Sequence, residues 1–146
     1  MKHWAAALAI WFAGCSGPKP GDIPSIHYGV DTCVRCGMAI SEKSFASGYV
    51  DGQGRSVVFD DVGEFLLAAR LEPSLAQFSF VHDAQDNRWL RVSEAFFIRA
   101  PGLATPMGTG FAAFASEGQA KSFSKRFATA GLPMKLAEAV AAAPSF

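Results

Sequence analysis

The apolar residues of this chain mark one order of short elements, strand, strand, helix and strand, and that order occurs twice. In the first half, residues 45–51 and 55–60 are predicted to form a hairpin across the glycine-rich turn at 51–54. A helix over 62–70 and a strand over 77–83 follow. Residues 27–44, which precede the hairpin, show no such periodicity and are expected to form an ordered loop.

The second half repeats this order without repeating the sequence. Its predicted elements are strands at 88–92, 95–99 and 110–115, a helix that begins after Ser116 and ends at Gly131, and a last alanine-rich helix over 133–143. The pattern predicts an α+β fold in which two similar ββαβ units, about 31–84 and 88–130, form one compact domain with a C-terminal helix.

Both longer helices begin with a capping pattern. Asp61 precedes the first helix with Glu64 three residues later, and Ser116 stands in the same relation to Gln119. We therefore interpret Asp61 as a helix cap and the neighbouring Asp60 as the end of a strand, rather than reading the two as paired catalytic carboxylates.

Residues 1–14 have the pattern of a secretory signal peptide, because the basic Lys2 is followed by an apolar run over 4–13 that is too short to cross a bilayer. Small residues then precede Cys15, as in a lipoprotein signal, so Cys15 is the predicted lipid-bearing first residue of the mature chain. Residues 15–26 are a flexible, lipidated tether. The alternative is an ordinary signal peptide with an incidental cysteine.

These features predict a lipid-anchored protein of a bacterial cell envelope that faces the periplasm. Ser16 after the cysteine favours the outer membrane. Residues 27–146 are left for one domain. Loss of Lys2 leaves twelve basic and thirteen acidic side chains, so no nucleic-acid partner is expected.

Once Cys15 is acylated, Cys33 and Cys36 are the only thiols, and this count excludes a disulfide scaffold. The thirteen Phe residues of a chain that is half hydrophobic can supply the core instead.

The segment Asp31-Thr32-Cys33-Val34-Arg35-Cys36-Gly37-Met38 carries the strongest chemical signal. Two thiols three residues apart can meet at one ion, and the thioether of Met38 can reach the same point across a flexible glycine. Sulfur donors in small number favour copper(I). Zinc is less suited because it prefers four ligands and methionine binds it poorly, and an iron–sulfur cluster needs four cysteines.

Two alternatives use the same cysteines without a metal: a thiol–disulfide redox protein, and a structural or sensory lipoprotein in which the pair is a disulfide staple. No helix pattern follows Cys36, whereas a thioredoxin-like motif sits at the start of a helix. Motifs of hydrolases and phosphate-binding enzymes are also missing from the sequence, and we do not expect an enzyme.

Four further residues have side chains that can bind copper. Met107, in the loop Thr105-Pro106-Met107-Gly108, is a candidate from a second part of the chain, with core packing as its alternative. His82 and His27 are weaker candidates, because a single histidine on an apolar strand is usually buried and paired. Met134 is expected only to pack.

Together these residues resemble the NosL family of copper-binding lipoproteins, the accessory proteins of nitrous oxide reductase. The matching segments span nearly the whole mature chain: the lipobox ending at Cys15, Cys33 to Met38, Asp51-Gly52 with Phe59-Asp60-Asp61, Trp89 to Ala95, Thr105 to Gly108, and Phe111 to Ala115 before a helix.

The resemblance implies a monomeric domain of two ββαβ units that binds one copper(I) through Cys33, Cys36, Met38 and Met107, with His82 as a further candidate. It also implies a metallochaperone that delivers copper to apo nitrous oxide reductase with the help of a membrane transporter complex. Copper delivery to a different envelope cuproenzyme is the alternative within this class. A carrier of this kind needs a partly exposed site of low coordination number, because an acceptor ligand must attack before its own ligands leave.

Overall fold

The computed structural model describes residues 17–144, and short strands and helices alternate along them. In chain order the elements are η1 (a 3₁₀ helix, Lys43–Phe45), β1 (Ser47–Val50), β2 (Ser56–Phe59), α1 (Val62–Leu71), η2 (a 3₁₀ helix, Pro73–Gln77), β3 (Phe80–His82), β4 (Trp89–Arg91), β5 (Phe96–Arg99), β6 (Phe111–Phe114), α2 (Glu117–Ser124) and α3 (Leu136–Ala142). The predicted α+β class is confirmed, with antiparallel sheets and, among the described residues, three α-helices.

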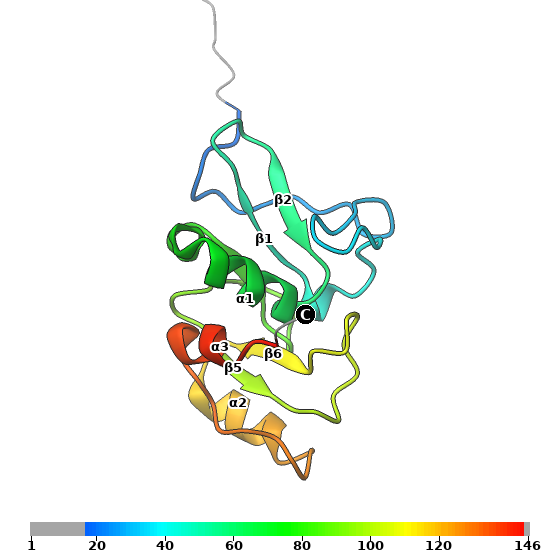
Figure 1. Ribbon diagram of the computed structural model, residues 1–146, viewed down its shortest axis with the longest axis vertical. Helices are drawn as coiled ribbons and strands as arrows, with labels where there is room; N and C mark the ends of the chain where they lie inside the picture. The colour runs from blue at the N-terminus through cyan, green and yellow to red at the C-terminus, as the bar shows by residue number, and fades with distance from the viewer. Residues whose placement is uncertain (1–16, 145–146) are drawn as a thin grey trace, which may run out of the picture.

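The first sheet has the strand order β2-β1-β3-β4 and is antiparallel throughout. Its strands β1 and β2 are seen side by side in the upper part of Figure 1. Ser47 of β1 lies between Phe59 of β2 and Val81 of β3, so the predicted hairpin and the strand after the first helix are adjacent. β4 pairs with β3 through His82 and Trp89. The order β1, β2, α1, β3 is therefore the first ββαβ unit.

The second unit begins later than predicted. The prediction placed the strand at 88–92 in the second half, but β4 belongs to the first sheet because Asn87, at φ 61°, turns the chain straight back along β3. The second sheet consists of β5 and β6, and Phe97 of β5 also pairs with Met134 through two backbone hydrogen bonds of 2.8 and 2.7 Å. The second unit thus runs from β5 to Met134, with β5 in its centre.

The helix starts are those predicted from the caps. The Asp61 carboxylate accepts the Gly63 N–H at 2.7 Å, and the Ser116 hydroxyl accepts the Gln119 N–H at 3.2 Å. The end of α2 was predicted wrongly, since the helix stops at Ser124 and not near Gly131. The Gly131 N–H donates to the Arg99 carbonyl at 2.8 Å, which places Gly131 beside β5.

Residues of both units share one hydrophobic core. Phe59 and Phe65 of the first unit and Phe97 and Phe111 of the second are all buried in the same cluster. A parallel bridge between Asp83 and Ala113 also joins the two sheets. The shared core explains why the two units form one domain. Within residues 17–144, no helix has the length and apolar character needed to span a membrane.

Candidate metal centre

The cysteine loop, residues 33–38, is held in a fixed conformation by its own backbone hydrogen bonds. The Cys33 N–H donates to the Met38 carbonyl at 2.8 Å, and the Gly37 N–H donates back to the Cys33 carbonyl at 2.9 Å. Gly37 adopts a φ of 73°, a left-handed conformation that glycine reaches without strain. The Val34 N–H donates to Val58 at 3.0 Å and attaches the loop to β2. The loop was predicted to be ordered and non-helical, and both expectations are confirmed.

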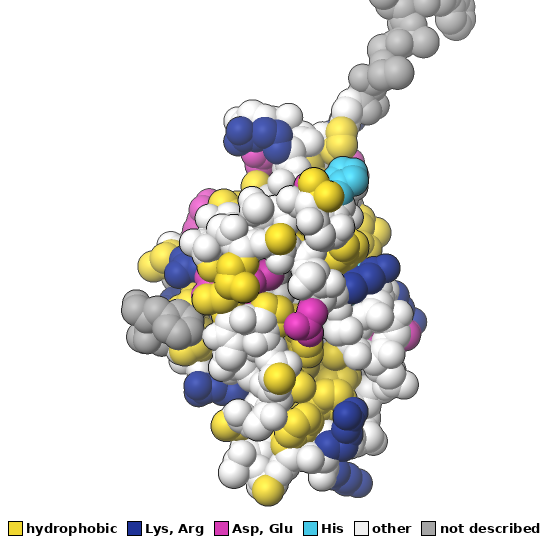
Figure 2. All heavy atoms as spheres, turned by 90° about the vertical axis from the view of Figure 1, so that its right-hand side faces the viewer, with side chains coloured by type: hydrophobic (Ala, Val, Ile, Leu, Met, Phe, Trp, Pro, Cys, Tyr) yellow, Lys and Arg dark blue, Asp and Glu magenta, His cyan; other side chains and the backbone are white. Residues whose placement is uncertain are grey.

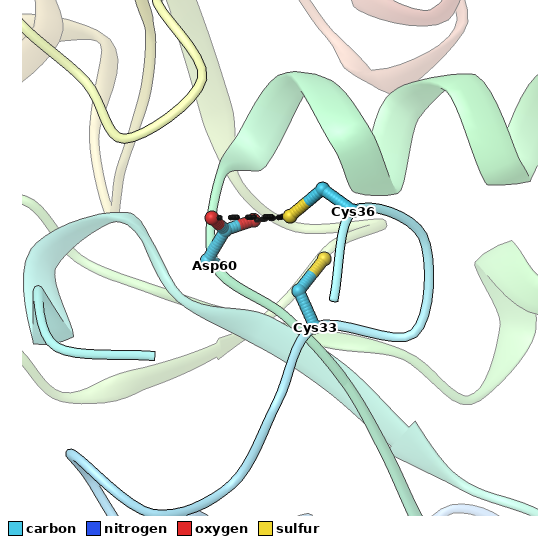
Figure 3. A group of neighbouring side chains, drawn as sticks. All are labelled: Cys33, Cys36 and Asp60. Atoms are coloured by element: carbon cyan, nitrogen blue, oxygen red, sulfur yellow. Dashed lines mark hydrogen bonds between the residues drawn. The ribbon is translucent and has the colours of Figure 1, made fainter. Parts of the chain in front are cut away.

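Two sulfur atoms and a carboxylate meet beneath this loop (Figure 3). Ligand atoms of Cys33, Cys36 and Asp60 lie within 4.8 Å of one another. The Cys36 thiol donates toward Asp60, with 3.5 Å between Sγ and each carboxylate oxygen. Cys33 and Asp60 are buried at 2% and 1% exposure, while Cys36 is partly exposed. Both cysteines are free thiols. The group can therefore hold a thiophilic metal ion that is reached from the side of Cys36.

The electrostatics of this group favour a bound cation. The pKa of the Cys36 thiol is raised to about 12, chiefly by burial and to a smaller extent by the nearby Cys33 and Asp60, although the Met38 backbone N–H acts in the opposite direction. A buried negative group without a partner costs free energy, and a metal ion that replaces the thiol proton relieves that cost.

Asp60 was missed by the sequence reasoning, which interpreted it only as a strand end. It does follow β2 directly, but its side chain is directed at the cysteine loop rather than at solvent (Figure 3). The signal that could have found it is the pair Asp60-Asp61 itself, because one cap explains only one of two consecutive carboxylates.

An ion pair fastens the cysteine loop to α1. Arg35, between the two cysteines, donates to the Glu64 carboxylate at 2.7 Å, and only 5% of the Glu64 side chain is exposed. Glu64 was predicted to reach back to its own helix start, but it binds Arg35 instead. The pair links the cysteine loop to the first turn of α1 and so holds Cys36 near Asp60.

The two candidate thioethers belong to two different loops. Met38 is 49% exposed, and Met107 is partly buried. The Met107 N–H donates at 2.9 Å to Asp61, the neighbour of Asp60. In Figure 1 the cysteine loop and the loop around Met107 both lie on the right-hand side, and Figure 2 shows this face, on which acidic and basic side chains are scattered among hydrophobic ones.

Within residues 17–144, neither His27 nor His82 is brought to this group. His82 is buried, its Nε2 lies 2.7 Å from the Tyr28 hydroxyl, and its Nδ1 lies 2.8 Å from the Asn87 carbonyl. The ring also stacks on Trp89 at 3.7 Å. Both nitrogens are thus engaged, which matches the alternative of a paired core histidine. His27 is exposed and lies 3.2 Å from Asp31. Met134 packs against the core. Cys15 lies outside the described residues.

The fold and the site together define a small α+β domain with a thiol-based candidate metal site at a loop. The family model described as NosL matches residues 27–138, and the chain belongs to the NosL family. The fold is similar to the crystal structure of the copper chaperone NosL from Shewanella denitrificans, with a TM-score of 0.63 and 19% identity over 82% of this chain and 96% of that one. The comparison with curated proteins finds no match.

Proposed function

We propose that this protein binds one copper(I) ion and transfers it to an acceptor protein. The observation that carries the proposal is the convergence of Cys33 and Cys36 at a loop edge, with Met38 beside them. Soft sulfur donors favour copper(I) over harder ions. Membership of the NosL family and a fold like that of a copper chaperone support the same function.

Charge balance points to Cys36, Met38 and Met107 as the principal ligands. One copper(I) ion with one thiolate and two neutral thioethers has no net charge, whereas a second thiolate beside the buried Asp60 would add charge in a poorly solvated place. Cys33 is then a second thiol, within 4.8 Å of Cys36, that can bind the ion when a thioether has left it.

The exposure of Met38 suits a carrier. Its side chain is half-exposed, so an acceptor ligand can replace it before the Cys36 thiol releases the ion. Among the described residues, Val34 is another exposed apolar side chain of the same loop, at 61%. A partner protein could cover both, which would exclude water during transfer.

A thiol–disulfide redox role has less support. Reactive thiols of redox proteins have lowered pKa values, often at a helix N-terminus. Here burial raises the pKa of Cys36, and the cysteine loop is closed by a β-bridge between Thr32 and Ala39 and does not lead into an α-helix. These features suit metal storage and transfer, and we propose a carrier without enzymatic activity.

We further propose that the acceptor is apo nitrous oxide reductase, reached together with a membrane transporter complex, and that the protein acts as a monomer. Lipidation of Cys15 would anchor it to the envelope facing the periplasm, at the outer membrane if Ser16 directs sorting. An anchor and the tether up to residue 26 would limit the search for the acceptor to the membrane surface. These proposals rest on the sequence pattern and the family.

An anaerobic competition titration with a colorimetric copper(I) chelator tests the binding. Met38→Leu should weaken copper(I) binding at least about tenfold, because it removes a sulfur ligand and preserves volume. Met134→Leu is the matched control, since Met134 packs in the core, and it should bind like the wild type. Equal affinity of Met38→Leu and wild type would contradict the ligand set.

Delivery needs a separate test. Copper(I)-loaded protein is mixed with apo nitrous oxide reductase while a chelator removes free copper, and copper in the separated reductase is measured. The account predicts transfer from the wild type and little transfer from Cys36→Ser. Failure of the loaded wild type to transfer, with another cuproenzyme accepting the metal, would show a different client.

A further inference from the structure

The Asp61 carboxylate makes more hydrogen bonds than a helix cap requires. It is fully buried, and its Oδ1 accepts the Gly63 N–H at 2.7 Å, which is the capping bond. The same oxygen accepts the Thr109 hydroxyl, and Oδ2 accepts the Thr105 hydroxyl at 2.7 Å and the Met107 N–H at 2.9 Å. Three of the four donors therefore come from one loop of the second ββαβ unit.

This loop also packs tightly on the first turn of α1. A Cβ atom at Gly63 would lie 2.5 Å from the side chain of Thr109, so only glycine permits the contact. Gly108 and Gly110, on either side of Thr109, have φ values of 67° and 70°, which fixes the path of the loop with few alternatives. The position of Met107 thus depends on the start of α1.

The start of α1 also contacts the metal group, which consists of Cys33, Cys36 and Asp60. Asp60, which precedes Asp61, faces Cys36 at 3.5 Å, and Arg35 of the cysteine loop binds Glu64 in the first turn. Consecutive carboxylates therefore hold two different loops: Asp60 contacts the cysteine loop and Asp61 carries the Met107 loop. Burying a carboxylate costs free energy, and most of the donors that offset this cost at Asp61 come from the Met107 loop, so the carboxylate ties that loop to the start of α1.

We propose that Asp61 is a positioning residue that keeps Met107 within reach of the copper(I) ion bound at Cys36. The inference rests on the proposed function and adds to it the group that brings a thioether from the second unit to thiols of the first. Asp61 itself does not touch the ion in this account. Loss of its loop contacts leaves the ion with Cys36 and Met38.

Two variants disturb this arrangement through different chemistry. Asp61→Asn keeps Oδ1 and therefore the helix cap, because Asn caps helices as well as Asp does. In place of Oδ2 it presents an NH₂ group to the Met107 N–H, and two donors cannot form a hydrogen bond. Gly63→Ala leaves the carboxylate intact and pushes Thr109 away by its added methyl group. If one of them does not fold, the other still answers the question.

The readout is the methyl NMR spectrum of protein labelled with [¹³C-methyl]methionine, recorded without and with one equivalent of copper(I). In the wild type, the Met38 and Met107 methyl signals should shift and that of Met134 should not. In Asp61→Asn and in Gly63→Ala, the Met38 signal should still shift while the Met107 signal stays in place. Copper(I) affinity should fall to the value of Met107→Leu.

A double variant separates positioning from general stability. Asp61→Asn should weaken copper(I) binding in the wild type and have no further effect in Met107→Leu, because the ligand it positions is already absent. A Met107 signal that shifts normally in Asp61→Asn, or an equal loss of affinity in both backgrounds, would overturn the proposal. If neither Met38 nor Met107 shifts in the wild type, the proposed copper(I) site itself is wrong.

Discussion

The Cys36 thiol and the Asp60 carboxylate face each other inside the metal group, with 3.5 Å between Sγ and each oxygen. This pairing gives the group a hard oxygen ligand beside soft sulfur ligands. Zinc accepts both kinds, whereas copper(I) prefers sulfur. Asp60 should therefore affect the binding of the two metals differently.

Asp60→Asn should separate the two metals. We expect zinc binding to weaken at least about tenfold, since the variant removes an anionic ligand, and copper(I) binding to change by less than about threefold. Competition titrations with a zinc indicator and a copper(I) chelator measure both. Asp86→Asn, at an exposed aspartate, is the control. A larger loss for copper(I) than for zinc would show that Asp60 binds the copper ion directly.

Arg35→Met should destabilise the fold by about 2 kcal/mol, because it leaves the buried Glu64 carboxylate without its partner. Urea unfolding measures the loss, and the second substitution Glu64→Gln should recover part of it. Lys121→Met breaks the exposed Glu117–Lys121 pair and should cost no more than about 0.5 kcal/mol. Equal losses of stability in Arg35→Met and Lys121→Met would mean that the Arg35–Glu64 pair does not hold the loop.

His82 should make stability depend on pH. Its pKa is lowered from 6.5 to about 4, chiefly by burial and to a smaller extent by the charge of Lys43. Between these values the unfolded chain binds a proton that the folded protein does not, so stability is lost as the pH falls through this window, by about 3 kcal/mol in total. Urea unfolding at several pH values should show a flatter decline in His82→Gln, whatever its absolute stability.

His27→Gln provides the matched control, because the His27 side chain is 74% exposed. The stability of His27→Gln should decline between pH 6.5 and 4 as much as that of the wild type does. An unchanged decline in His82→Gln would assign the pH dependence to other groups.

Arg70 of α1 holds the C-terminal end of α3. Its guanidinium donates to the carbonyl of Val140 at 2.7 Å and to those of Ala141 and Ala143, at the C-terminal end of α3. Arg70→Met should cost about 2 kcal/mol and speed hydrogen exchange in α3 before it does so in β1. Arg88→Met, at a largely exposed arginine, should leave exchange in α3 unchanged. Unaltered exchange in α3 of Arg70→Met would contradict this anchoring role.

Local signals in the sequence predicted most of the fold. The caps at Asp61 and Ser116 lie within three residues of the N–H groups they accept, and the glycine-rich turn at 51–54 joins two adjacent strands. The turn at Asp86-Asn87 likewise joins the adjacent strands β3 and β4. The bridge between Phe97 and Met134 was not predicted, because partners that are distant in sequence are chosen by tertiary packing. Gly131 was misread as a helix end, since its partner Arg99 is distant in sequence.

The same distinction applies to the metal group. Cys33, Cys36 and Met38 stand within six residues, so their chemistry is visible in the sequence, and the structure brings the two thiols together. Asp60 lies 24 residues from Cys36, and its role depends on how the cysteine loop packs on α1. The engagement of both His82 nitrogens by Tyr28 and Asn87 likewise needed the folded structure.

X-ray absorption at the copper edge of protein loaded anaerobically with one equivalent of copper(I) tests the central claim most directly. The account predicts a coordination shell of two or three sulfur atoms and no nitrogen or oxygen atom, reduced by one sulfur in Met38→Leu and unchanged in Met134→Leu. A shell containing nitrogen or oxygen, or a protein that retains no copper(I) after gel filtration, would contradict it.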